Sequence, residues 1–103
     1  MKKTFKIIDI IDNKNCLDPK LGDMVFRAIA PELINGNAVE LDFCDVKLIV
    51  THFLDSAVGR LYNPKTFDVN CVKNNLTFKN LGTRESLIAD VIDNAINYYR
   101  KIR

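Results

Sequence analysis

The chain has 103 residues and a formal net charge of +2, so it has room for one domain and is too short for two. Hydrophobic residues make up 48% of it and charged residues 27%, values that exclude a disordered chain and are ordinary for a globular one. The weak charge, with no basic run interleaved with aromatic side chains, argues against nucleic acid as a partner. We therefore expect one domain over residues 1–103.

The first predicted elements are a strand and a helix. Residues 4–11 are rich in β-branched and aromatic side chains and predict a mostly buried strand. Asp18 followed by Pro19 is a typical N-cap and first helical residue. Apolar residues recur at helical spacing after Pro19 and predict a helix, which Pro31 breaks or kinks near its end and Gly36 stops.

A second strand and a second helix follow. Apolar and acidic side chains alternate in residues 38–44, which predicts a strand with one covered face. Residues 47–50 continue the extended chain. From Thr51 the apolar residues recur three and four apart, so an amphipathic helix is expected to begin there and to end at the Asn-Pro pair of residues 63–64.

The last third contains one more strand and one more helix. Residues 67–72 fit a short strand, a helical turn or a loop equally well, whereas residues 76–81 alternate as a strand does. Thr83 is a good N-cap for the last helix, whose broad apolar stripe runs over residues 87–99. Strands and helices therefore alternate, which predicts an α/β fold with a central β-sheet and about three to four helices.

The joint between the second strand and the second helix, "VTHF" at residues 50–53, is where chemistry is most readily placed. Thr51 is expected to cap the helix, and its hydroxyl would also lie beside a helix terminus that favours phosphate. His52 is the only histidine, so any acid–base or nucleophilic scheme must use it, although a surface position is the more common role. Asp42 and Asp45 could hold a cation, but capping of amides in the turn between them is the favoured interpretation.

Cysteine and hydropathy patterns constrain cofactors and location. Cys16, Cys44 and Cys71 are widely spaced and form no CxxC pair, and a zinc site would need about four ligands. We therefore expect no metal and no other cofactor, and reduced thiols in the cytoplasm. No segment approaches the ~20 apolar residues that span a bilayer, so no membrane association is expected.

One stretch resembles a known family. "LDFCDVKLIVTHFLDSAVGRLY", residues 41–62, is similar to the core motif of the STAS domain (sulfate transporter and anti-sigma factor antagonist), and more closely to small bacterial STAS-like domains of unknown function. The shared pattern is a strand ending in "LDF", an acidic-apolar turn, a hydroxyl-bearing joint, and a helix ending in Gly before an apolar residue. Here these parts are residues 41–43, 45–46, 51–53 and 59–61.

The resemblance implies a binding module. STAS domains of anti-sigma antagonists dock through this helix start onto an ATPase of the histidine-kinase superfamily, which phosphorylates a Ser or Thr at the joint and ends the interaction. Thr51 matches that acceptor by position. Val50 and His52 depart from the antagonists, in which an Asp commonly precedes the acceptor and a Ser follows it.

We therefore predict a non-catalytic regulatory protein-interaction module. Its predicted partner-binding residues are Asp45, Lys47, Thr51, His52 and Asp55, with Thr51 as the candidate phosphoacceptor. Two alternatives stay open. The first is a small enzyme or nucleotide- or ligand-binding domain that uses the crevice around His52, oriented by Asp42 or Asp45. The second is a homo-oligomer that associates through Tyr98, Tyr99 and Ile102, residues that could equally complete the core.

Overall fold

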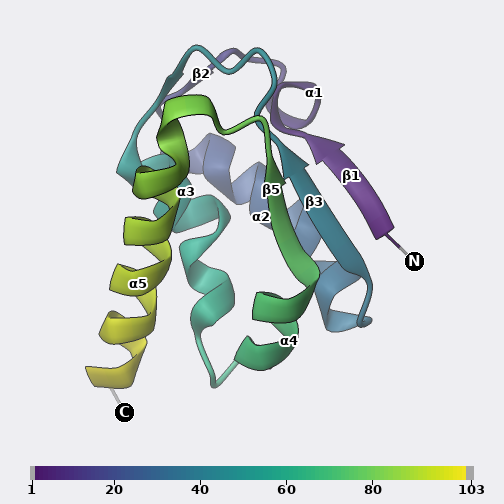
Figure 1. Cartoon of the computed structure of the whole chain (residues 1–103), viewed down its shortest axis with the longest axis vertical. Coiled ribbons are helices and arrows are strands. Elements are labelled where there is room, and N and C mark those ends of the chain that lie inside the picture. The colour runs from purple at the N-terminus through teal and green to yellow at the C-terminus, as the bar shows by residue number, and fades with distance from the viewer. Residues whose placement is uncertain (1, 102–103) are drawn as a thin grey trace.

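The computed structural model describes residues 2–101, in which three parallel strands form the central sheet. These strands are β1 (Lys2–Lys6), β3 (Ala38–Asp42) and β5 (Leu76–Lys79), and β3 lies in the middle (Figure 1). A separate parallel pair, β2 (Asn15–Cys16) and β4 (Leu48–Ile49), forms a short ribbon beyond the end of the sheet. The predicted α/β class and central sheet are confirmed.

Helices connect the strands. The α-helices are α1 (Ile7–Ile11), α2 (Pro19–Ile34), α3 (Thr51–Ala57), α4 (Val69–Asn75) and α5 (Glu85–Lys101). Two 3₁₀ helices, η1 (Gly59–Tyr62) and η2 (Gly82–Arg84), follow α3 and precede α5. The count of α-helices in the described chain exceeds the three to four expected, because α1 was predicted as part of a strand and the α4 segment was left open. No helix in residues 2–101 is long and apolar enough to cross a membrane.

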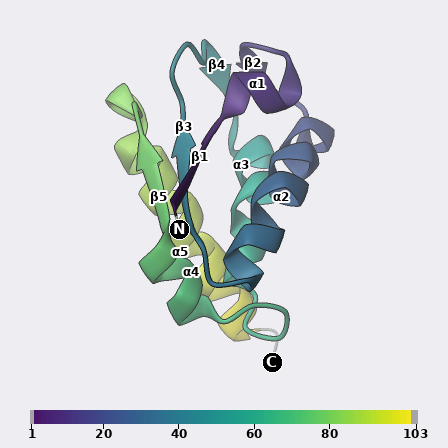
Figure 2. The same ribbon diagram turned by 90° about the vertical axis from the view of Figure 1, so that its right-hand side faces the viewer.

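The sheet has one covered face and one polar face. Val39 and Leu41 of β3 are fully buried and belong to the same core as buried residues of α2, α3 and α5. Glu40 lies between them on the opposite face, where it accepts a hydrogen bond from Thr4 Oγ1 at 3.1 Å and pairs with Lys2 Nζ at 3.2 Å. The predicted alternation is therefore confirmed. The helices lie on one side of the sheet (Figure 2), and cross-strand polar pairs lie on the other face.

The first predicted strand, residues 4–11, is wrong in its second half. The chain leaves β1 at Lys6 and forms α1, which Asp12 ends in the left-handed conformation at φ 52°. Ile7 and Ile11 are four residues apart and both are buried, so the continuous apolar run fits one helical turn as well as a strand. The spacing of apolar residues alone does not distinguish a strand from a helical turn here.

The helix α2 begins as predicted and runs through its proline. Asp18 is the N-cap, and its carboxylate accepts a hydrogen bond from the Lys20 amide at 2.9 Å. Pro31 does not break the helix, because α2 continues for three more residues to Ile34. Pro31 is exposed and close to the end, so water can reach the carbonyl that loses its amide partner.

Both predicted threonine caps are wrong, and the structure decides among the three conformations left open for residues 67–72. Val50 is the N-cap of α3, and Thr51 is its first helical residue. Thr83 lies inside η2, before α5 begins. Residues 67–72 enter α4, whose N-cap Asp68 accepts a hydrogen bond from the Cys71 amide at 3.2 Å. The helical turn was thus the correct alternative.

Candidate functional site

The start of α3 presents three of the predicted site residues on one exposed face. The short β4 strand carries the chain into α3, and the Val50 amide donates to the Cys16 carbonyl at 3.1 Å. The next residues follow the helical period, so Phe53 points into the core and is fully buried. Thr51, His52 and Asp55 are exposed on the other side. The structure therefore brings these three side chains together on a rigid support.

The turn before β4 carries the other two predicted residues. Asp45 and Lys47 are both exposed, and Asp45 takes the left-handed conformation at φ 65°. Asp42 caps this turn, since its Oδ1 accepts hydrogen bonds from the Cys44 amide and from Asn80 Nδ2, both at 2.8 Å. The Asn80 hydrogen bond is the main reason that the pKa of Asp42 lies below its usual value. The favoured capping interpretation of Asp42 is confirmed.

Two basic side chains hold the same turn in place. Arg84 Nη2 donates to the carbonyls of Val46 and Lys47 at 2.9 and 3.1 Å. Lys6 Nζ lies 3.6 Å from Asp45 Oδ2. Arg84 was missed by sequence reasoning, because a bond that spans 38 residues leaves no local pattern. The turn is thus anchored to η2 and to the end of β1.

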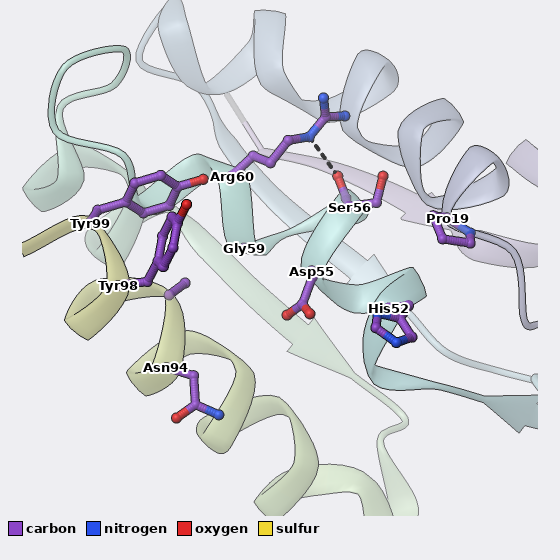
Figure 3. Close-up of a pocket in the computed structure, with 10 residues that line it drawn as sticks. Pro19, His52, Asp55, Ser56, Gly59, Arg60, Asn94, Tyr98 and Tyr99 are labelled. Carbon is purple, nitrogen blue, oxygen red and sulfur yellow. Dashed lines mark hydrogen bonds between the residues drawn. The ribbon is translucent and has the colours of Figure 1, made fainter. Parts of the chain in front are cut away.

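A groove of about 630 Å³ runs beside α3, between it and α5 (Figure 3). His52 and Asp55 of α3 and Arg60 of η1 line one side, and Asn94, Tyr98 and Tyr99 of α5 line the other. Among the residues drawn in Figure 3, no hydrogen bond joins His52 to Asp55 or to Ser56. The groove therefore contains two of the predicted site residues, but not Asp45, Lys47 or Thr51.

Arg60 is fixed by three contacts at the edge of this groove. Its Nε donates to the Ser56 carbonyl at 3.0 Å, and its Nη2 pairs with Asp23 of α2. Its guanidinium carbon lies 3.8 Å from the centre of the Phe26 ring, which adds a cation–π contact. The pKa of Asp23 is lowered, first by the hydrogen bond from Arg60. Asp23 also pairs with Arg27 Nε at 2.7 Å.

Two tyrosines form the aromatic wall of the groove. The rings of Tyr98 and Tyr99 meet edge to face with centroids 5.1 Å apart. Tyr98 is 58% exposed, whereas Tyr99 is half-buried, and burial is the first cause of its raised pKa, ahead of the neighbouring Tyr98. The sequence suggested both as an oligomer contact or core residues. The third residue of that prediction, Ile102, lies outside the described residues.

The cysteines and acidic side chains are dispersed. Cys16, Cys44 and Cys71 are free thiols, and burial raises the pKa of Cys16 to about 11. Within residues 2–101, no three His, Cys, Asp or Glu side chains gather closely enough to hold a metal ion.

Comparison with known families adds one finding. A STAS-like domain of unknown function (DUF4325) matches residues 22–84, which is more than half of the chain. The chain belongs to this family. The matched STAS-like region runs from α2 to η2 and includes the turn at Asp45 and the start of α3, whereas β1 and α5 lie outside it. No curated protein and no solved structure matches the chain.

Proposed function

We propose that this STAS-like protein is a non-catalytic regulatory module that docks onto a protein partner through the start of α3. The docking surface consists of Asp45, Lys47, Thr51, His52 and Asp55. The single observation that carries the proposal is the position of Thr51. It is exposed on the first turn of α3, yet Val50 and not Thr51 is the cap, so its hydroxyl is not needed to start the helix.

The support beneath this surface favours docking. Phe53 and Leu54 are fully buried directly under the exposed residues, so a partner would meet a rigid helix start. A specific interface needs ~800 Å² on each side, so we expect the partner to contact the loops that flank the α3 start as well as these five residues. Charged groups of both signs surround the centre, as in a polar interface rim.

Family membership supports the kind of partner. In anti-sigma factor antagonists the corresponding helix start meets an ATPase of the histidine-kinase superfamily, and we propose a partner of this class here. Phosphorylation of Thr51 would add roughly −1.5 to −2 charges next to Asp55, and a partner docked on the first turn would be repelled. Such a modification would control the interaction without changing the fold.

The test is a pull-down of tagged protein from the native host at natural expression, read by mass spectrometry. Thr51→Glu is expected to lose at least about nine-tenths of the captured ATPase or kinase, because a charge is placed inside the interface. Thr51→Val removes the hydroxyl without adding charge and is expected to retain the partner. Thr66→Glu places the same charge on an exposed threonine in the turn between η1 and α4, and serves as the matched control.

Circular dichroism of each variant separates a lost interface from a lost fold. Thr51→Glu should keep the wild-type spectrum and melting temperature, since the side chain is exposed. If Thr51→Glu kept both its fold and the partner, the docking proposal would fail.

The groove favours a second candidate function, binding of a small ligand in the crevice at His52. A volume of about 630 Å³ lies within the range of ~300–1,000 Å³ typical of small-molecule sites. This candidate uses His52 and Asp55 but requires neither Thr51 nor a protein partner.

A further inference from the structure

We infer that the groove between α3 and α5 binds a small organic cation, an amine or guanidinium group carried on an apolar body. The inference rests on the second candidate function, ligand binding in this groove, and names the chemical class of the ligand. It is independent of docking at Thr51.

Asp55 is the carboxylate that lines the groove, and it is the charged group there that is left without an ion-pair partner among the described residues. Arg60, the one permanent cation lining it among the described residues, is paired with Asp23, and its Nε is occupied by the Ser56 carbonyl. Asp55 makes no ion pair within residues 2–101 and is exposed. A ligand that enters therefore meets an unpaired carboxylate and a guanidinium whose Nε and Nη2 are already engaged by Ser56 and by Asp23, a carboxylate that Arg27 shares.

The carboxylate of Asp55 lies above the floor of the groove. A Cβ placed on Gly59 would lie 3.8 Å from Asp55 Oδ1 and 3.7 Å from Ala95 Cβ. Gly59 thus joins the two walls and, because it has no side chain, leaves open the space between the carboxylate and α5. Figure 3 shows Asp55 projecting from α3 into this space.

The opposite wall offers aromatic surface to the same ligand. Tyr98 and Tyr99 present an edge-to-face pair, and Tyr98 remains 58% exposed. Aromatic rings attract ammonium and guanidinium groups through their electron-rich faces and also bury apolar surface. A carboxylate without an ion-pair partner, facing two tyrosines across a groove of small-molecule size, suits a cation with an apolar body.

The aromatic wall lies outside the matched family region. Asn94, Tyr98 and Tyr99 belong to α5, and the STAS-like match ends at residue 84. The docking surface lies wholly inside that match. The proposed ligand site therefore combines Asp55, which lies inside the matched region, with an aromatic wall that lies outside it.

The test is a titration followed in ¹H–¹⁵N correlation spectra of the full chain with three probes of similar shape. Phenethylammonium is the cation, 2-phenylethanol the neutral analogue and phenylacetate the anion. Phenethylammonium is expected to shift the amides of Asp55, Gly59 and Ala95 and to bind at least about fivefold more tightly than 2-phenylethanol. Added salt should reduce the difference in affinity between phenethylammonium and 2-phenylethanol, because it screens the charge of Asp55.

Three variants locate the site. Asp55→Asn should bring the affinity for phenethylammonium to that for 2-phenylethanol, a loss of about fivefold or more. Asp93→Asn removes an exposed carboxylate on α5 that does not line the groove, and should change the affinity by less than about twofold. Ala95→Leu fills the groove and should abolish the shifts for all three probes, while the rest of its spectrum shows that it is folded.

Each other outcome contradicts one stated part of the inference. If 2-phenylethanol or phenylacetate binds in the groove as tightly as the cation, and Asp55→Asn has no effect, the cation inference is wrong while ligand binding stands. If none of the three probes shifts the groove amides, both the cation inference and the ligand-binding function are wrong. If a blocked Gly-Lys-Gly tripeptide binds more tightly than phenethylammonium, the groove recognises a lysine of a partner chain and the small-molecule inference is wrong.

Discussion

Asp42 shapes the turn that carries two of the proposed docking residues. Its carboxylate joins the end of β3 to the Cys44 amide and, across 38 residues of sequence, to Asn80 after β5. Both bonds use the same oxygen. Asp45 and Lys47 owe their positions to this turn, so a residue outside the docking surface determines its geometry.

Replacing Asp42 with Ala is expected to lower the free energy of unfolding by about 1–2 kcal/mol, because two hydrogen bonds to a carboxylate are lost. Asp42→Asn retains an acceptor oxygen and should cost less. Urea unfolding followed by circular dichroism measures both, with Asp9→Ala at an exposed site as the control. A loss no larger than that of the control would show that the turn does not depend on Asp42.

At this scale the sequence predicted local partners and missed distant ones. The Asp18 cap follows from its place before a proline, and the Asp42 cap follows from its place at a strand end. The cap at Thr51 was wrong by one residue, because the hydroxyl suggested a cap that the backbone places at Val50. Arg60 pairs with Asp23 across 37 residues, and no local spacing encodes such a pair.

The position of α3 depends on its close contact with α2. Gly22 of α2 faces α3 so closely that an added Cβ would lie 2.4 Å from the Phe53 carbonyl oxygen and 2.9 Å from Ser56 Cβ. No rotation of a side chain can relieve a contact with backbone. Glycine is required at this position because the two helices approach each other there, and the same approach places His52 and Asp55 beside the groove.

Gly22→Ala is therefore expected to destabilise the protein by about 1–3 kcal/mol, although alanine favours helices more than glycine does. The thermal unfolding midpoint should fall, and α3 should shift enough to weaken partner capture. Met24→Ala, two residues along α2 at a 43% exposed position, is the control and should change the midpoint little. If Gly22→Ala raised the thermal unfolding midpoint, the close approach of α2 and α3 would not require glycine at this position.

Elements with a clear period were predicted well, and short ones were not. The helix α5 has a long apolar stripe and was correctly placed, as were the β3 and β5 strands. Residues 7–11 and 69–75 form short helices whose few apolar residues fit several structures. Their conformation is decided by packing, since Ile7, Ile11 and Val72 are all buried in the common core.

At the scale of the whole molecule, stability depends on pH in the alkaline range because two buried groups have raised pKa values. Burial raises the pKa of Tyr62 to about 12 and that of Cys16 to about 11, from ordinary values of 10.0 and 9.0. The folded state therefore holds these protons more tightly than the unfolded state does. The associated stability is complete below pH 9 and is lost as the pH rises through the folded pKa values.

Urea unfolding in the presence of a reductant should show a free energy that falls by on the order of 3 kcal/mol between pH 8 and pH 11. Tyr62→Phe and Cys16→Ala should each flatten part of this decline, whatever they cost at neutral pH. A decline that is equally steep in the double variant would assign the alkaline sensitivity to other groups.

The arrangement of the whole sheet goes beyond what the sequence predicted. Alternation of strands and helices indicated the α/β class, but the order β1-β3-β5 depends on contacts between distant segments. The groove was only partly predictable. His52 and Asp55 stand out in the sequence, whereas Tyr98 and Tyr99 become groove residues only because α5 packs beside α3.

Hydrogen–deuterium exchange on the complex with the captured partner tests the docking proposal most directly. Peptides that cover residues 45–55 should be protected in the complex relative to the free protein, and peptides of the polar sheet face, residues 2–6 and 76–79, should not change. Protection of the sheet face, with residues 45–55 exchanging as in the free protein, would contradict docking through the start of α3.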